Sequence, residues 1–296
     1  MSVDETLRAH VTGGSGFLGG FVIPLLREAG YEVSALARSA AAAAKVESLG
    51  ATPVQGDLDS RDALRSAFES AAPSALVNLA SLGFGHASAI VQAAEAAGLR
   101  RAVFVSTTAI FTKLNAPSKQ VRTAAERTIE ESDLDWTILR PTMIYGTPGD
   151  RNMWRLLRQL RRLAVVPMPG GGKQLQQPVH VADLAHAVVA ALQTAAAVGK
   201  AYDIAGPDAL TFRQIVASAG AAVGRSPRAL PLPARPIIRV LTRVEATGRS
   251  LPVKAEQVER LIEDKAFDIS EAVADLGFAP RSFDEGIRAE ARMDAP

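Results

Sequence analysis

Short apolar runs alternate with longer amphipathic segments over residues 7–139. The apolar runs have the length of strands, and the segments between them carry apolar residues at helical spacing. Predicted strands cover residues 7–12, 32–36, 52–55, 75–79, 102–106 and 136–139, and predicted helices cover 19–28, 40–49, 61–70, 87–97 and 118–131. This alternation is typical of βαβ units, so the pattern predicts an α/β fold with a Rossmann-type, doubly wound parallel sheet.

The last of these helices carries an apolar stripe that predicts its buried face. Val121, Ala124, Ala125, Thr128 and Ile129 stand at i, i+3, i+4, i+7 and i+8. Residues at this spacing share one side of a helix, so we expect that side to lie against the sheet.

The pattern changes after Gly146, where glycines and prolines become frequent. A helix is expected at 181–196, a strand at 201–205, and amphipathic helices at 151–162 and 235–249. The irregular connections favour short helices over more sheet. The sequence thus predicts a Rossmann domain over residues 1–147, to which 178–206 return, and a smaller, mostly helical lobe over 148–296.

A glycine-rich turn joins the first predicted strand to the first predicted helix, with Gly13, Gly16 and Gly19 spaced by three. In this setting the glycines permit a tight turn, a close approach of backbone to a pyrophosphate, and close packing of helix on strand. Amide groups at a helix N-terminus also attract phosphate. The turn predicts a dinucleotide site formed by Gly13, Ser15, Gly16, Phe17, Leu18 and Gly19, the alternative being an ordinary glycine-rich turn.

Further motifs follow in order: Gly56-Asp57-Leu58, Asn78-Leu79-Ala80, Val105-Ser106-Thr107-Thr108, then residues 140–146, 178–183 and 275–281. Over nearly the whole chain, their order and spacing resemble the extended and atypical short-chain dehydrogenases/reductases, in the branch of NAD-dependent epimerases and dehydratases. The resemblance implies that residues 1–147 bind NAD(P) and that the second lobe binds substrate. It implies further cofactor contacts from Asp57, Leu58, Leu79, Ala80, Ser81, Pro141, Thr142 and Ile144. The alternatives are a turn role for Asp57, core packing for Leu79 and Ala80, and a helix stop at Pro141.

The end of the second strand bears on the choice of nicotinamide cofactor. An NAD site usually has a carboxylate there, about 20 residues past the glycines, to bind the ribose 2′-hydroxyl. This chain has Arg38 and Ser39 instead. A guanidinium pairs well with a 2′-phosphate, so we predict NADP(H) over NAD(H), the alternative being a solvated arginine.

The proton-transfer pair of the family is missing from this sequence. Members of the family use Tyr-x-x-x-Lys, in which the tyrosine exchanges a proton while the nicotinamide exchanges a hydride. The three tyrosines Tyr31, Tyr145 and Tyr202 are followed four residues later by Ala35, Gly149 and Gly206. The usual hydride-transfer mechanism is therefore in doubt.

Three hydroxyl groups are candidates for the roles of the missing Tyr-x-x-x-Lys pair. Alignment on Glu126 puts Ser118 in the tyrosine position and Arg122 in the lysine position, where Arg122 would bond the nicotinamide ribose. Thr108 would hold a substrate oxygen or cap a strand end. Tyr145 would serve as an alternative acid or as a packed hinge residue. The catalytic candidates are thus Thr108, Tyr145 and Ser118.

His180 and Asp183 have the spacing of an acid–base pair on one helix face. Because Asp183 precedes an apolar periodic run, we favour a structural role at the start of a helix.

Composition narrows the class of protein. The 296 residues contain no cysteine and four scattered histidines, which argues against disulfides, iron–sulfur clusters and a metal site. Thirty-three basic residues stand against 31 acidic ones without a basic run, so no nucleic-acid partner is predicted. No segment predicts a membrane span or a signal peptide, so we expect a cytoplasmic location.

Two functions remain open from the sequence. The first is an NADP-dependent reductase or epimerase acting on a carbonyl or nucleotide-sugar substrate that is small and possibly anionic, in a monomer or homodimer. The second is a sensor or assembly protein that binds NADP(H) without turnover.

Overall fold

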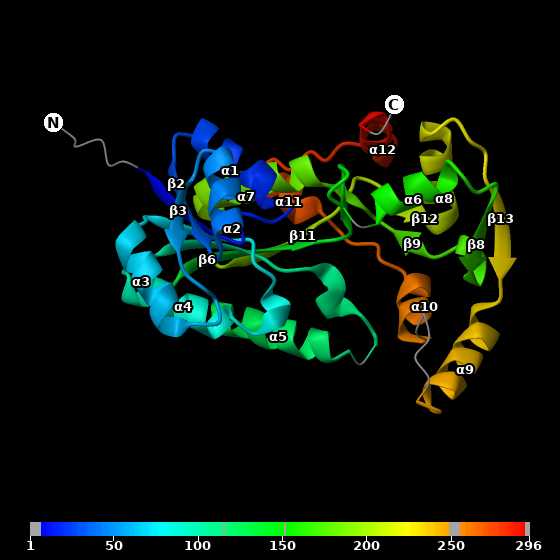
Figure 1. Cartoon of the computed structure of the whole chain (residues 1–296), viewed down its shortest axis with the longest axis horizontal. Coiled ribbons are helices and arrows are strands. Elements are labelled where there is room, and N and C mark those ends of the chain that lie inside the picture. Colours follow the sequence, from blue (N-terminus) through cyan, green and yellow to red (C-terminus); the bar gives the residue numbers. More distant parts are fainter. Residues whose placement is uncertain (1–6, 115, 151, 249–254, 294–296) are drawn as a thin grey trace.

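The computed structural model describes residues 7–114, 116–150, 152–248 and 255–293. Its centre is a seven-stranded sheet in the order β11-β6-β5-β4-β1-β2-β3 (Figure 1). All neighbouring strands in this sheet are parallel. The strands are β1 Arg8–Thr12, β2 Glu32–Ala37, β3 Thr52–Gln55, β4 Ala75–Asn78, β5 Arg101–Val105, β6 Asp135–Pro141 and β11 Lys200–Ile204. The predicted doubly wound Rossmann sheet is confirmed.

Helices cover both faces of the sheet. The helices α1 Gly19–Glu28, α2 Ala40–Ser48, α7 Val181–Gln193 and α11 Ser270–Leu276 contribute to one apolar core. A second core, on the other face, contains α3 Arg61–Ala71, α4 Ala87–Ala96 and α5 Pro117–Glu130. Burying apolar side chains on both faces explains why the central strands are nearly continuous apolar runs.

The buried face of α5 differs from the predicted stripe. Ala125 and Ile129 are buried, but Val121 is 38% exposed and Ala124 is exposed too. The charged Glu126 is buried instead, at 4% exposure, because it pairs with Arg140 on β6. The face of α5 that is buried is therefore the one that carries the Glu126–Arg140 pair, and it includes only part of the predicted apolar stripe.

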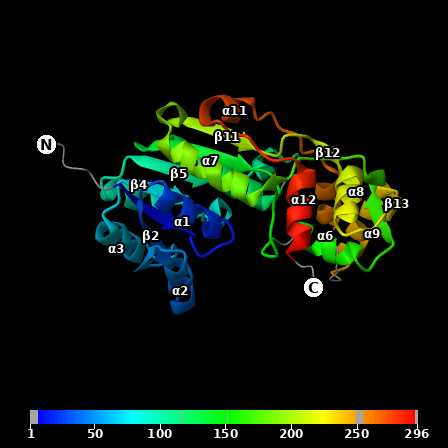
Figure 2. The same cartoon turned by 90° about the horizontal axis from the view of Figure 1, so that it is seen from above.

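The second part of the chain forms a lobe beside one end of the sheet (Figure 2). Its helices are α6 Met153–Leu160, α8 Phe212–Ala222, α9 Ala234–Glu245, α10 Ala255–Ile262 and α12 Phe283–Arg292. Short strands pair here as β7 Ile144–Tyr145 with β10 Val179–His180, β8 Val165–Pro169 with β13 Arg228–Leu232, and β9 Leu175–Gln176 with β12 Leu210–Thr211. The sequence pattern missed these pairs. Four of the strands have only two residues and so no measurable period, and β8 and β13 contain prolines, which argue against a strand.

In the described part of the chain, no helix has both the length and the apolar character needed to cross a membrane.

Candidate functional site

The turn after β1 depends on glycine at two positions. Gly13 has φ +73°, and a Cβ atom there would lie 2.7 Å from the backbone nitrogen of Ala80, in the loop after β4. A Cβ atom on Gly19 would lie 2.0 Å from the carbonyl oxygen of Gly14. The amide of Gly16 donates to the carbonyl of Gly13 at 3.0 Å and closes the turn. The backbone therefore approaches itself too closely for any side chain.

Free amide groups at this turn fit a phosphate. Within the described residues, the amides of Ser15, Phe17 and Leu18 donate no hydrogen bond, and Ser15 and Gly16 are exposed. A cavity of about 900 Å³ opens beside Ser15, Gly16 and Phe17; we call it the phosphate-side cavity. Unsatisfied amides at the start of a helix are suited to bind an anion. Leu18 differs from its neighbours, because its side chain is buried in the sheet–helix core.

Arg38 and Ser39 lie where the sequence analysis expects them, directly after β2. Arg38 is exposed, and its guanidinium forms no hydrogen bond or ion pair with any described residue. The Ser39 hydroxyl accepts a hydrogen bond from the amide of Ala42 at 3.2 Å and caps α2. The Arg38 charge is thus available to a ligand at the edge of the sheet.

The loops after β3 and β4 reach the same edge of the sheet, with some side chains already engaged. Asp57 accepts from the amide of Asp59 at 3.1 Å, which is a local turn contact. Ser81 accepts from the amide of Gly83 at 3.2 Å. Leu58 and Leu79 pack partly against the two cores. Because these side chains already have partners, the groups that remain for a ligand in these loops are mainly backbone atoms.

A second cavity of about 760 Å³ lies next to the first, and we call it the inter-lobe cavity. Thr142, Met143 and Asn152 line both cavities. Thr142 is held in place because its hydroxyl donates to the carbonyl of Gln177 and its amide donates to that of Ile204 at 3.0 Å. Ile144 lines the phosphate-side cavity, whereas Pro141 is buried at the end of β6. The two cavities are therefore adjacent and share part of their walls, with the glycine turn bordering one of them.

Two of the three catalytic candidates line the inter-lobe cavity. Thr108 donates to the carbonyl of Pro141 at 3.3 Å, and Ser118 lies in the first turn of α5 without a hydrogen bond to any described residue. A serine or threonine hydroxyl without a neighbouring base is a poor proton donor. These two groups are suited to hold a substrate oxygen.

Tyr145 lines neither cavity. Its side chain is 1% exposed and packs between His180 and Phe283, with ring centroids 5.4 and 5.2 Å away. Burial, and then the charge of Asp183, raise the pKa of its phenol. The structure places Tyr145 as a packing residue, whose phenol reaches neither cavity.

Arg122 lies on α5 against the loop after β4. A Cβ atom on Gly83 would come within 3.1 Å of its guanidinium, which forms no ion pair with a described acid. Burial, and then the nearby Arg260, lower the pKa of Arg122. Arg260 is itself paired with Glu256, whereas Arg122 has no acidic partner among the described residues, so its guanidinium is available to an oxygen-rich group.

A buried ion pair supports the ends of β5 and β6. Nε and Nη2 of Arg140 donate to Oε2 of Glu126 at 2.9 and 2.7 Å, and the Ser106 hydroxyl donates to Oε1. The Arg140 guanidinium also lies 5.4 Å from the ring of Phe111. This cluster fixes the strand ends that carry Thr108 and Thr142.

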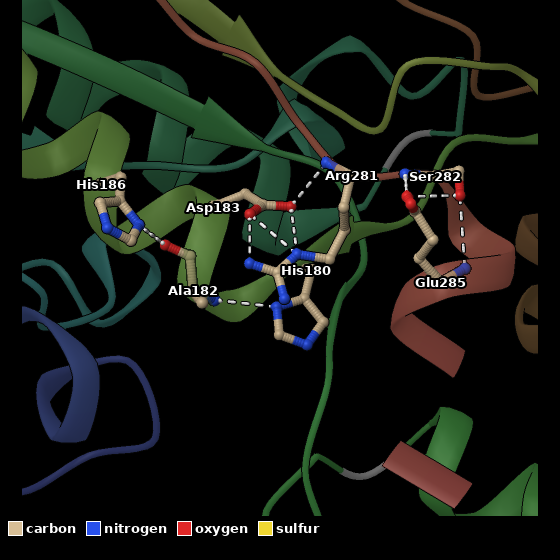
Figure 3. Close-up of polar contacts among 7 residues, drawn as sticks. All are labelled: His180, Ala182, Asp183, His186, Arg281, Ser282 and Glu285. Carbon is tan, nitrogen blue, oxygen red and sulfur yellow. Dashed lines mark hydrogen bonds and ion pairs between the residues drawn. The ribbon is translucent and has the colours of Figure 1, made fainter. Parts of the chain in front are cut away.

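His180 and Asp183 have structural partners (Figure 3). Nδ1 of His180 accepts from the amide of Ala182 at 3.2 Å, and Asp183 binds the guanidinium of Arg281 at 2.7 Å. Burial, and then Arg281, lower the pKa of His180 to about 4. The histidine is therefore neutral and the aspartate is paired, in agreement with the predicted role at the start of α7.

The sequence analysis missed the segment that covers the inter-lobe cavity. Residues 262–267 line it from the second lobe. Glu263 accepts from the Thr112 hydroxyl at 2.7 Å and from the Lys113 amide at 2.6 Å, which joins the two lobes. No motif marks this segment, because its role depends on contacts made about 150 residues away in sequence.

Comparisons with known proteins agree with this geometry. The family model described as NAD(P)H-binding matches residues 13–195, more than half of the chain. A mitochondrial NADH dehydrogenase [ubiquinone] 1 alpha subcomplex subunit 9 from Arabidopsis thaliana is 33% identical over 146 residues, which cover 48% of this chain and 35% of that protein. The chain thus spans about a third of this relative's length.

An NAD(P)H azoreductase from Xenophilus azovorans is 28% identical over 221 residues, 74% of each chain. The solved UDP-glucose 4-epimerase of Thermotoga maritima superposes with a TM-score of 0.75 at 18% identity, over 97% of this chain and 98% of that one. This likeness concerns the fold. The chain therefore belongs to the NAD(P)H-binding family, on an extended short-chain dehydrogenase/reductase-like fold.

Proposed function

We propose that this protein is an NADPH-dependent reductase of a small acceptor bound in the inter-lobe cavity. The observation that carries the proposal is that the two cavities are adjacent, since Thr142, Met143 and Asn152 line both. It supports a division in which residues 1–147 and 178–206 hold the cofactor, and the substrate lies against the lobe of residues 148–296. NADPH, when bound, would supply a hydride.

The residues that would hold this cofactor come from adjacent strand ends. Backbone amides at Ser15, Gly16 and Phe17 would bind the diphosphate, and Arg122 would bind the nicotinamide ribose. Thr142 and Ile144 would line the nicotinamide side. Arg38 would pair with the 2′-phosphate, and the hydroxyl of Ser39 could donate a further hydrogen bond.

Replacing Arg38 by alanine is expected to change the cofactor preference. Loss of a charge-assisted phosphate contact should weaken NADPH binding by roughly ten- to hundredfold, with little change for NADH. Calorimetric titration with both dinucleotides measures this. Arg27→Ala, on α1, is a matched control. Equal affinity for NADH and NADPH, unchanged by Arg38→Ala, would remove the preference from the proposal.

The cavity also favours a class of acceptor. Thr108 and Ser118 can hold a carbonyl-type oxygen, but neither has a base beside it, and Tyr145 lies elsewhere. An acceptor whose reduced form is a stable anion can take its proton from water and needs no acid from the protein. Quinones meet this condition. The relative named as an azoreductase supports a reductase with an acceptor other than a simple sugar.

The rate of NADPH oxidation should therefore differ among a panel of quinones, aldehydes and nucleotide sugars when each is offered as the acceptor. Quinones are expected to react fastest. Thr108→Ala should lower kcat/KM about tenfold or more through loss of a hydrogen bond to the acceptor, whereas Tyr145→Phe should leave the rate unchanged. A rate that falls in Tyr145→Phe and persists in Thr108→Ala would contradict this assignment.

A second function, NADPH binding without turnover, is favoured by the missing Tyr-x-x-x-Lys pair. Tight NADPH binding combined with no oxidation by any member of the panel would select it.

A further inference from the structure

A surface hollow of about 450 Å³ lies on α6, outside the two cavities already described. Its lining includes Asp150, Trp154, Arg155, Arg158 and Arg162. Of its lining residues, Asp150 alone also lines the phosphate-side cavity. In the second lobe α6 packs against α8 and α12 (Figure 2), and its residues Arg155, Arg158 and Gln159 are exposed. The proposed reductase activity makes no use of this hollow.

Three arginines form one row along the hollow. Arg155 and Arg158 stand at i and i+3 on one face of α6, and Arg162 follows in the turn after the helix, where it lines the same hollow. All three are exposed, and within the described residues their guanidinium groups form no hydrogen bond or ion pair. Like charges at this spacing disfavour a helix. The row therefore carries an electrostatic cost that an anion would remove.

One acid, Asp150, lies in the hollow, and its carboxylate is bound by backbone amides, with no ion pair to the three arginines among the described residues. Oδ1 of Asp150 accepts from the amides of Asn152 and Trp154 at 2.8 and 3.2 Å, and Oδ2 accepts from the amide of Gly146 at 3.3 Å. Glu290 is fully buried nearby, where burial, and then Asp150, raise its pKa to about 9. It is therefore neutral at physiological pH. Three guanidinium groups against one carboxylate give the lining of the hollow a net positive charge.

Trp154 adds a flat aromatic surface to the row of charges. The side chain is half-buried and lines the hollow, next to the arginines on the helical wheel. A partly buried indole ring offers a stacking surface at little entropic cost. The paired N–H groups of an arginine guanidinium match the oxygens of a phosphate group. The volume of the hollow, about 450 Å³, lies in the range of small-molecule binding sites.

We propose that this hollow binds a phosphorylated aromatic ligand, with its ring against Trp154 and its phosphates along Arg155, Arg158 and Arg162. The ligand site is separate from the glycine turn. An acidic protein segment would use the arginines but has no need of the ring or of the hollow, so we favour the small molecule.

Trp154 can report on its own site. Trp136 is the other of the two tryptophans, so Trp136→Phe leaves Trp154 as the only indole. With NADP⁺ kept saturating, so that the coenzyme site is filled, ATP serves as the probe. We expect a saturable change in Trp154 fluorescence, weakened about tenfold by Arg158→Gln and more strongly by raised salt. Arg239→Gln, an exposed arginine on α9, is the matched control and should bind ATP as before.

Calorimetry with two further variants tests the role of the ring. Trp154→Phe should retain ATP binding, and Trp154→Ala should lose most of it. The proposal is overturned if ATP gives no saturable signal, if Arg158→Gln binds ATP unchanged, or if saturating NADP⁺ abolishes a response seen without it. A glutamate-rich peptide that saturates the signal where ATP does not would also overturn it, in favour of a protein partner.

Discussion

Replacing Gly19 by alanine is expected to destabilise the protein severely and to abolish NADPH binding. The added Cβ atom would lie 2.0 Å from the carbonyl oxygen of Gly14 and 2.7 Å from its Cα atom. Both are backbone atoms of the turn, so neither can move aside without opening the turn or lifting α1 from the sheet. We expect a loss on the order of 3 kcal/mol in the free energy of unfolding, measured by urea denaturation.

The neighbouring glycine provides the control. A Cβ atom on Gly20 meets nothing within 4 Å, although Gly20 lies on the same helix. Gly20→Ala should leave stability unchanged or raise it by about 0.5–1 kcal/mol, because alanine favours helix. If Gly19→Ala unfolded at the same urea concentration as Gly20→Ala, the close contact inferred for the turn would be wrong.

The second large effect is expected from Glu126→Gln. This change removes the charge that Arg140 contacts at 2.7 and 2.9 Å, in a place where Glu126 is 4% exposed. Breaking a buried ion pair by removing one partner typically costs about 3–5 kcal/mol, because the other charge stays buried without compensation. Urea denaturation measures the loss. In the double variant Glu126→Gln/Arg140→Met, most of the stability should return.

Glu130 supplies a matched comparison on the same helix. Its Oε1 atom lies 3.9 Å from the same Arg140 guanidinium, but its side chain is 43% exposed. Solvent screens such a pair, so Glu130→Gln should cost less than about 1 kcal/mol. Similar losses in both variants would show that burial of the pair is not what makes Glu126 important.

The strands and helices of the first half were predictable because each one repeats a local pattern. The predicted helix at 19–28 coincides with α1, and the predicted strand at 52–55 coincides with β3. The predicted helix at 181–196 ends earlier, since α7 stops at Gln193. Val121 is exposed although it belongs to the predicted apolar stripe, because the spacing of apolar residues carries no information on the pairing of Glu126 with Arg140.

The candidate site was predictable to a lesser degree. Residues after strand ends meet at one edge of a parallel sheet, which predicted the places of Arg38 and Asp57. The family resemblance implied the places of Leu79 and Thr142. The packing of Tyr145 between His180 and Phe283 did not follow, nor did the closure of the inter-lobe cavity by residues 262–267. Both depend on segments far apart along the chain.

The parallel sheet, the glycine turn and the missing Tyr-x-x-x-Lys pair can be read from the order of residues alone, because periodicity, turn chemistry and spacing are local properties of a chain. Only the tertiary structure decided the adjacency of the two cavities, the burial of Tyr145 and the arginine-lined hollow on α6. Side chains distant in sequence meet there, and their burial and charge depend on which neighbours they meet.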